Sequence, residues 1–276
     1  MPNIYNQNLV WIRGAGDLAT GIAIRLLNSG FQVVLSEIDQ PTVIRTNVSF
    51  ATAVYEDNFD VEGHAAKLCH SILEIQKALE EKVTPVFVGD EISAIGVIKP
   101  LVFIEGTIRK RPYEVPREQV PFCVGIGPGF NASKDVDAVI ETQRGHYLGR
   151  VIYSGEAVPN TGIPGDIGGY TTERVIHAPE AGVVSATCHI GDNVKVGQKI
   201  AQIGSDCLVK ATIDGVLRGM IHDGLYLEKG TKMADIDPRC ELEHCFTVSD
   251  KARAIGGGVL EAIMHFISFN SKANSL

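Results

Sequence analysis

The stretch that decides the fold is "VWIRGAGDLATGIAIRLLNSGFQVVLSEID", residues 10–39. An apolar run over residues 9–13 predicts a short buried strand. The apolar residues that follow recur at helical spacing, namely Leu18, Ile22, Ala23, Leu26 and Leu27. Gly30 is placed to end that helix, as glycine often does just past a C-terminus. Residues 31–36 predict a second strand, so the stretch indicates a strand, a glycine turn, a helix and a strand in succession.

The turn itself has the spacing G-x-G-x-x-G/A, with Gly14, Gly16 and Ala19 at the three small positions. The first glycine makes the turn, the second leaves room for a pyrophosphate, and the third residue packs helix against strand. The amides that open the helix then face the phosphate. Glu37, at the end of the second strand, stands where an acid binds a ribose hydroxyl and disfavours a 2′-phosphate. These residues predict a Rossmann-like unit that binds a small nucleotide-type ligand.

Asp17 directly follows Gly16 and allows two interpretations. Its carboxylate lies either at the mouth of the phosphate site, where it repels an anion, or at the start of the helix as a cap. We include Asp17 among the candidate cofactor-binding residues, with both interpretations open.

The first half of the chain alternates between strand and helix patterns. Apolar runs stand at 84–89, 100–106, 121–127 and 137–142, and helical patterns stand at 41–53 and 70–82. Such alternation is typical of an α/β fold with a mostly parallel sheet. We expect a Rossmann-like domain over 1–150, followed by a linking Gly/Pro loop at 151–174.

An internal repeat dominates residues 175–240. "HAPEAGVVSATCHIGDNVKVGQKIAQIG" (177–204) aligns with "KATIDGVLRGMIHDGLYLEKGTKMADID" (210–237) at a constant offset of 33 residues. Three pairs of glycines match under this offset: Gly182 with Gly215, Gly191 with Gly224, and Gly197 with Gly230. Repeated glycines indicate repeated turns, because each marks a backbone position that other residues adopt only at a cost. The repeat predicts a small, β-rich, pseudo-two-fold domain.

This repeat resembles the biotinyl/lipoyl-type barrel-sandwich domains. Carrier domains of that type present a lysine at the hairpin between the halves, whereas the hairpin here reads "IGSDCLVKA" with Ser205, Asp206 and Cys207 at its tip. Lys210 stands back in the following strand. We therefore expect the fold without its swinging arm, and neither biotin nor lipoate.

Residues 241–276 predict a C-terminal helix that packs on the first domain, with Ser249 or Asp250 as its cap. The helix contains "GGG" at 256–258, and three interior glycines cost about 3 kcal/mol relative to alanine. Either the helix breaks there, or its backbone closely approaches another element or a ligand.

Further candidate residues follow the later strands. Gly127 and Gly129 lie in a second glycine turn, whose amides either bind an anion or form a loop shaped by Pro128. Arg144 is suited to clamp a phosphate and His146 to titrate near neutrality, unless both are solvated charges at a domain edge.

The catalytic residues are unknown, and Cys123 and His146 are the candidates. Cys123 is either a nucleophile or chalcogen carrier, or a small buried hydrophobic residue. Cys240, His244 and Cys245 lack the spacing of a zinc site, so we expect no metal site.

Composition narrows the class of protein. The net charge of −8 opposes nucleic acid as the main partner, since phosphate binding shows as a basic footprint. The apolar runs are too short to span a bilayer, and we see no export signal. Six cysteines in a chain without an export signal favour reduced thiols and a cytoplasmic protein. The length of 276 residues favours two domains.

Several motifs together resemble the YqeB-type proteins of selenium-dependent molybdenum hydroxylase systems. They are "RGAGDLATG", "IGPGF" followed by "DVDAVIETQRGHYLGRVI", "TGIPG" and "SDKARAIGGGVLEAI". The resemblance implies an accessory role in maturing the molybdenum cofactor or inserting selenium, with a molybdenum hydroxylase and a selenium donor as partners. The first segment is also similar to the Rossmann domain of XdhC-type maturation factors, but only Gly14, Gly16 and Ala19 carry that likeness.

The expected ligand is thus either molybdenum cofactor, in its pterin dinucleotide form, or NAD. Two alternatives stay open: an NAD-dependent oxidoreductase, and a non-catalytic adaptor that docks a hydroxylase or a selenium donor. Whether the chain is an enzyme is undecided at this point.

Overall fold

The computed structural model describes residues 6–108 and 115–273, which form two compact units. Unit 1 consists of Met1–Asp39, Phe50–Asn160 and Val248–Leu276, and unit 2 of Gln40–Ser49 and Thr161–Thr247. The chain therefore leaves unit 1 twice, once for ten residues and once for a whole β-rich region. In the described part of the chain, no helix combines the length and apolar character needed to cross a membrane.

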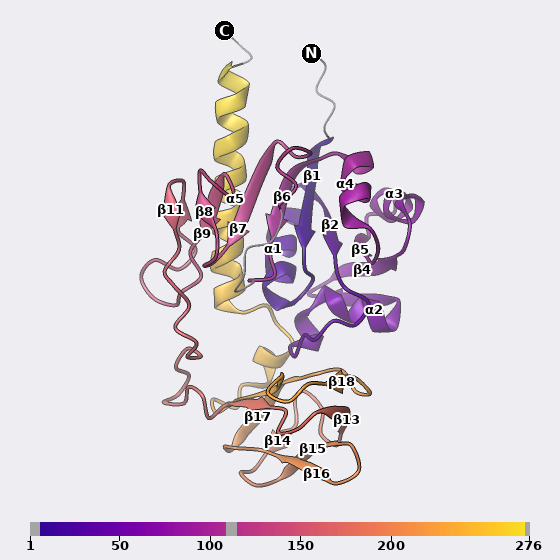
Figure 1. Cartoon of the computed structure of the whole chain (residues 1–276), viewed down its shortest axis with the longest axis vertical. Coiled ribbons are helices and arrows are strands. Elements are labelled where there is room, and N and C mark those ends of the chain that lie inside the picture. The colour runs from indigo at the N-terminus through magenta and orange to yellow at the C-terminus, as the bar shows by residue number, and fades with distance from the viewer. Residues whose placement is uncertain (1–5, 109–114, 274–276) are drawn as a thin grey trace. The chain divides into compact units, whose positions relative to one another are not determined.

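Unit 1 is built on a nine-stranded mixed sheet with the order β10-β9-β7-β6-β1-β2-β5-β4-β3 (Figure 1). Its strands are β1 (Asn6–Arg13), β2 (Gln32–Ser36), β3 (Asn58–Val61), β4 (His64–Cys69), β5 (Thr84–Phe87), β6 (Pro100–Glu105), β7 (Phe122–Ile126), β9 (Ala138–Ile140) and β10 (Val151–Ile152). All neighbouring pairs are parallel except β3–β4 and β9–β10, at the two edges. A separate two-stranded sheet pairs β8 (Asn131–Ala132) with β11 (Gly155–Glu156).

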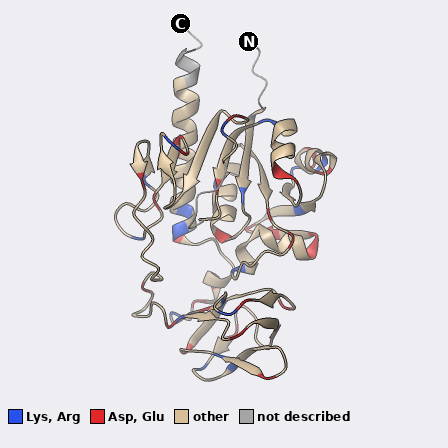
Figure 2. Ribbon diagram, viewed as in Figure 1, with Lys and Arg blue, Asp and Glu red and all other residues tan. Residues whose placement is uncertain are grey.

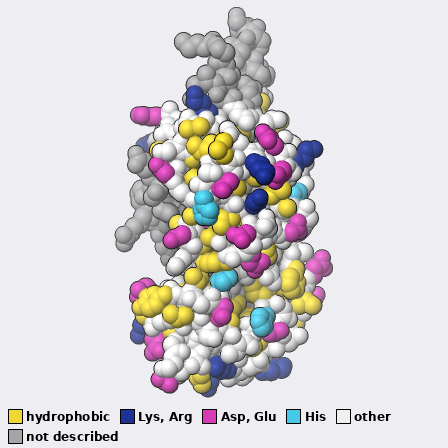
Figure 3. Space-filling model, turned by 90° about the vertical axis from the view of Figure 1, so that its right-hand side faces the viewer, with side chains coloured by type: hydrophobic (Ala, Val, Ile, Leu, Met, Phe, Trp, Pro, Cys, Tyr) yellow, Lys and Arg dark blue, Asp and Glu magenta, His cyan; other side chains and the backbone are white. Residues whose placement is uncertain are grey.

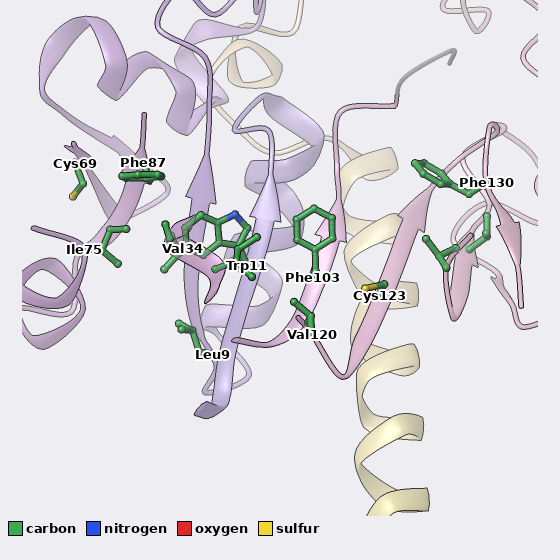
Figure 4. Packing of buried hydrophobic residues seen from close by; sticks show 14 of the residues in the cluster. Leu9, Trp11, Val34, Cys69, Ile75, Phe87, Phe103, Val120, Cys123 and Phe130 are labelled. Atoms are coloured by element: carbon green, nitrogen blue, oxygen red, sulfur yellow. The ribbon is translucent and has the colours of Figure 1, made fainter. Parts of the chain in front are cut away.

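Helices cover both faces of the nine-stranded sheet. The helices of unit 1 are α1 (Asp17–Leu27), α2 (Ala53–Glu56), α3 (Ile72–Glu80), α4 (Glu91–Ile98) and α5 (Asp250–Ala273), with a 3-10 turn η2 (Phe50–Thr52) before α2. Side chains of α3 and α4 join Trp11 and Phe103 in one buried cluster (Figure 4). In Figure 1, α1 and α5 run side by side along the opposite face, where they make close contact.

The predicted local elements are confirmed in most places. β1, α1, β2, β5, β6, β7, β9 and α3 lie where the periodicity put them, and α3 begins with a capping box between Ser71 and Glu74. The predicted helix over 41–53 is wrong, since this stretch holds 3-10 turns, among them η1 (Thr46–Val48). The physical reason is that the chain passes from unit 2 back to unit 1 between Ser49 and Phe50, so one helical face cannot be buried along the whole stretch.

Unit 2 contains two four-stranded antiparallel sheets, β12-β19-β17-β14 and β16-β15-β13-β18. Its strands are β12 (Val175–His177), β13 (Gly182–Ala186), β14 (Asn193–Val194), β15 (Lys199–Ile203), β16 (Cys207–Lys210), β17 (Gly215–Met220), β18 (Tyr226–Leu227) and β19 (Lys232–Asp237), and a 3-10 turn η3 (Leu242–Cys245) follows them.

The internal repeat is confirmed strand by strand. The 33-residue offset carries β13 onto β17, β14 onto β18 and β15 onto β19, and it exchanges the two sheets of unit 2. Paired glycines adopt matching conformations, as at Gly197 and Gly230, with φ of +82° and +85°. Each sheet takes strands from both halves, so neither half is a complete structure by itself.

The predicted fold class, a Rossmann-like domain with a mostly parallel sheet plus a barrel-sandwich-like domain, is wrong. The structure has one large mixed sheet and several separate antiparallel sheets instead. The β3–β4 hairpin adds one antiparallel edge and β10 adds the other. The strands of the β3–β4 hairpin are not among the apolar runs from which we predicted the sheet, and the periodicity of a strand does not show the direction in which β10 pairs with β9.

Helix α5 runs unbroken through Gly256, Gly257 and Gly258, which settles the two alternatives left by the sequence. A Cβ added at Gly256 would lie 3.2 Å from the carbonyl oxygen of Gly21 in α1, and one at Gly258 would lie 2.1 Å from that of Gly149. The glycines therefore let the helix backbone approach its neighbours closely.

Candidate site at the carboxyl edge of the unit 1 sheet

The candidate site lies where the parallel strands of unit 1 end. β1, β6, β7 and β9 run in the same direction, so the segments that follow them lie at one edge of the sheet. These segments begin at Gly14, Gly106, Gly127 and Glu141. Ligands of open parallel sheets bind at this edge, where the connections leave the sheet in opposite directions. Here β1 connects to β2 on one side, while β6 lies on its other side.

Gly14 makes the tight turn after β1 in a left-handed conformation, with φ of +88°. Its amide donates to the carbonyl of Ser36 at 2.7 Å, and a Cβ added there would lie 2.9 Å from Cγ2 of Thr107. Any side chain at this position would therefore be strained and would collide with the segment after β6.

Glu37 reaches the same turn from the end of β2. Its carboxylate accepts a hydrogen bond from the amide of Ala15 at 2.7 Å and one from the amide of Ile38 at 3.0 Å. Tyr55 lies nearby, and burial, then the charges of Glu37 and Asp39, raises the pKa of Tyr55 to about 12. Glu37 thus stands beside the glycine turn, with a protonated phenol in its neighbourhood.

Helix α1 opens on Gly16, which is its N-cap and has no side chain to offer. Gly16 therefore makes no side-chain cap hydrogen bond, and Asp17 is the first helical residue, not the cap. Ala19 is buried, and its Cβ lies 3.4 Å from where a Cβ of Gly106 would be. The helix start therefore has no N-cap side chain and packs closely on the segment that follows β6.

A buried network of charges holds these segments in place. Arg13 forms ion pairs with Glu91 and with Glu105, the latter at 2.9 Å. Nε1 of Trp11 donates to Oε1 of Glu91 at 3.0 Å and to Oγ of Ser36 at 3.1 Å. Removing one partner from a buried pair of this kind costs about 3–5 kcal/mol, because the other charge stays buried. The network ties the ends of β1, β2 and β6 to the start of α4.

The second glycine turn is shaped by its neighbours in the chain. Gly127 has φ of +79°, donates its amide to Ile140 at 2.9 Å, and would place a Cβ 2.7 Å from Oγ1 of Thr142. Gly129 also has a positive φ, +105°. Packing alone therefore explains the glycine at 127, whatever ligand the turn contacts.

Glu141 organises the segment after β9. It is buried, and its carboxylate accepts the amides of Thr142 and Gln143 at 2.7 Å each and the amide of Val158 at 2.8 Å. Three amide donors satisfy this charge, so we interpret Glu141 as a structural carboxylate of the loop.

Arg144 and His146 do not meet the glycine turn as a pair. Arg144 forms a two-pronged ion pair with Asp250 at the start of α5, with N–O distances of 2.6 and 3.0 Å. His146 is exposed, and its ring packs edge-on against Tyr147. The structure thus gives Arg144 a partner within the protein and leaves His146 on the surface.

Sequence reasoning missed Lys251, in the first turn of α5. Partial burial, followed by the charge of Arg144, lowers the pKa of Lys251, while Asp17, Glu141 and Asp250 act in the opposite sense. Figure 2 shows basic and acidic segments together at this end of α5. Local sequence gave no signal for this residue, because only the contact of α5 with α1 brings it to the glycine turn.

Cys123 is fully buried on β7, with its sulfur inside the cluster drawn in Figure 4. Burial, and then the charge of Asp137, raises the pKa of the Cys123 thiol to about 12. A thiol in this state is protonated at neutral pH and is unsuited to act as a nucleophile.

The surface of the chain does not gather charge of one sign on the face drawn in Figure 3. Basic, acidic and hydrophobic side chains are interspersed there. In the described residues, no group of three or more His, Cys, Asp or Glu is arranged to hold a metal ion.

Comparison with solved structures found weak likenesses. They include an aspartoacylase family protein from Mesorhizobium loti, 10% identical over 78% of this chain and 59% of that chain, with a TM-score of 0.25. A succinylglutamate desuccinylase from Silicibacter sp. TM1040 is 12% identical over 83% of this chain and 84% of that chain, also with a TM-score of 0.25. Likenesses at this level carry no argument about fold or activity.

Comparison of sequences gave a stronger result, although no protein-family model matches the chain. A curated protein of Escherichia coli (strain K12), described as "Uncharacterized protein YqeB", is 48% identical over 267 residues. The match covers 97% of this chain but only 49% of that protein. The chain is thus a relative of YqeB along nearly all of its length, belongs with the YqeB proteins, and spans about half the length of the curated protein it matches.

Proposed function

We propose that the chain is an accessory protein for selenium-dependent molybdenum hydroxylases, acting in the cytoplasm. In this proposal it binds a nucleotide-bearing ligand, molybdenum cofactor or a dinucleotide, and supports cofactor maturation or selenium insertion. The hydroxylase and the selenium donor would be its protein partners. This biological setting rests on the resemblance of the motifs to YqeB-type proteins, whereas the nucleotide-type ligand rests on the site.

The observation that carries the ligand is the opening of α1. The first-turn amides follow Gly14 and Gly16, and the N-cap residue, Gly16, has no side chain to cap them. Uncapped amides at a helix start, with the positive end of the helix dipole, suit a diphosphate. Molybdenum cofactor or NAD would place its diphosphate there, with Gly16 and Asp17 beneath it.

The position of Glu37 suits the binding of a ribose next to that diphosphate. Its carboxylate already accepts the amide of Ala15, and in this proposal a ribose hydroxyl donates to the same carboxylate. A 2′-phosphate would be repelled by this charge, so we expect NAD to bind better than NADP. Ile38 follows with 53% of its surface exposed, and it offers an apolar face for a base.

The experiment is calorimetric titration of the chain with NAD, NADP and a pterin dinucleotide, with Gly16→Asp as the variant. The proposal predicts binding of the pterin dinucleotide and its loss in Gly16→Asp, because the new carboxylate fills the phosphate position. Unchanged binding by Gly16→Asp would refute this placement of the site.

An NAD-dependent oxidoreductase is the second candidate, favoured by Glu37 at the ribose position. It predicts binding of nicotinamide cofactors alone, with no response to the pterin dinucleotide. A non-catalytic adaptor predicts instead that capture of a hydroxylase survives Gly16→Asp.

A further inference from the structure

The close crossing of α1 and α5 brings one lysine to the start of α1. A Cβ added at Gly21 would lie 2.6 Å from Cβ of Ala252, so the two helices touch at the first turn of α5. Lys251 immediately precedes Ala252, and Asp17 stands about one helical turn before Gly21. The crossing therefore places the first turn of α5, which contains Lys251, near the opening turns of α1.

The charged groups that face Lys251 come from three segments. They are Asp17 of α1, Glu141 and Arg144 of the segment after β9, and Asp250 of α5 itself. The carboxylates are also engaged elsewhere: Glu141 accepts three backbone amides, Asp250 pairs with Arg144, and Asp17 is not without a further partner. Within the described residues, neither a hydrogen bond nor an ion pair shorter than 4 Å holds the ammonium of Lys251.

A partly buried ammonium in this setting is poorly solvated and lacks a close partner. Its pKa is lowered, first by desolvation and then by Arg144. Burial destabilises the charged ammonium form of Lys251. A bound anion would stabilise that form again, since an opposite charge within about 4–6 Å favours ionisation.

The same lysine answers the difficulty raised by Asp17. A carboxylate in the first turn of α1 opposes the approach of a diphosphate, although it favours the helix itself. The attraction between Lys251 and Asp17 offsets that negative charge at the mouth of the turn.

We propose that Lys251 is a phosphate-binding residue of this site, which neutralises Asp17 and donates to the diphosphate of a nucleotide-type ligand. The inference rests on the proposed function and adds a specific cation to it. The C-terminal helix then adds a cation to the glycine turn and helix start, which come from the first forty residues.

The test is calorimetric titration with NAD and with inorganic pyrophosphate. The variants are Lys251→Met, Asp17→Asn and the double variant, with Lys77→Met as the matched control on an exposed lysine of α3. Lys251→Met should weaken both probes about 10- to 100-fold, as expected for a hydrogen bond to a charged group. Asp17→Asn should restore part of that loss in the double variant, and Lys77→Met should bind as the wild type does.

The outcomes separate the two proposals. If Gly16→Asp abolishes binding while Lys251→Met leaves it unchanged, the assignment of Lys251 is wrong and the proposed function stands. If Lys251→Met abolishes binding but Gly16→Asp does not, the placement at the glycine turn fails. If the wild type binds neither probe, the placement of a diphosphate at the start of α1 and the assignment of Lys251 are both wrong.

A second readout distinguishes a ligand contact from a structural role. After ¹³C reductive methylation of the lysines, pyrophosphate should raise the pKa of the Lys251 amine followed by NMR, and leave that of Lys77 unchanged. A Lys251 resonance that titrates identically with and without pyrophosphate would overturn the assignment, whatever the variants do to stability.

Discussion

Single residues set the chemistry of the site, and Lys251 and Cys123 show how burial decides it. The ammonium of Lys251 is partly buried beside Arg144, and the thiol of Cys123 is enclosed between strands. In both cases desolvation disfavours the charged form, which lowers the pKa of a lysine and raises that of a cysteine. The same physical cause thus makes the lysine more responsive to an anion and the cysteine less reactive.

The lowered pKa of Lys251 predicts a pH-dependent stability. In the window between this lowered value and the ordinary 10.5, the unfolded chain binds more protons than the folded one. The contribution of Lys251 to the free energy of unfolding therefore rises with pH across that window. In ligand-free urea titrations, Lys251→Met should be more stable than the wild type near pH 7, and the difference should shrink towards pH 10.5. A difference that grows with pH would contradict this account.

The raised pKa of Cys123 predicts protection from alkylation. Burial also raises the pKa of the Cys69 thiol, to about 11. At pH 8 in the native state, iodoacetamide should modify the exposed Cys240 and spare Cys123 and Cys69. Mass spectrometry of the digested protein measures this directly. Modification of Cys123 faster than Cys240 would contradict this prediction and would favour Cys123 as a nucleophile.

Whole elements depend on glycines in two different ways. In the α1–α5 crossing, Gly21 has no room for a side chain, whereas Gly257 of α5 has nothing within 4 Å of an added Cβ. In unit 2, Gly197 and Gly230 also have open space but adopt a left-handed conformation. Packing therefore requires a glycine at Gly21, whereas the left-handed backbone requires one at Gly197 and Gly230.

The packing of α1 on α5 predicts opposite effects at two glycines. Gly21→Ala should destabilise the chain by about 1–3 kcal/mol, because its Cβ would meet that of Ala252 at 2.6 Å. Gly257→Ala, the matched control, should stabilise it by up to about 1 kcal/mol, since alanine favours an open helix interior. Urea denaturation measures both, and equal effects of the same sign would refute the crossing.

The repeat in unit 2 predicts equal effects at equivalent positions. Gly197→Ala and Gly230→Ala should each destabilise by about 1–2 kcal/mol, because both residues hold a left-handed φ near +80°. A large difference between the two variants in thermal unfolding would contradict the pseudo-symmetry.

Across the whole molecule, the sequence predicts the elements that neighbouring residues determine, and it misses the contacts between segments that lie far apart in the chain. β1, the Gly14 turn and α1 follow from neighbouring residues, and so does the 33-residue repeat. The β3–β4 hairpin is itself local, but its attachment to β5 depends on tertiary pairing, as does that of β10 to β9. The excursion of residues 40–49 into unit 2 depends on contacts with distant strands. Lys251 was missed for the same reason, since the charged groups that act on it, apart from Asp250, are more than one hundred residues away in the chain.

If the amides that open α1 bind a diphosphate, titration with pyrophosphate followed by amide NMR should detect the contact. We expect the largest shifts at Gly16, Asp17 and Leu18, with Lys251 responding at the same concentrations. Shifts confined to other segments, or none at saturating pyrophosphate, would contradict it.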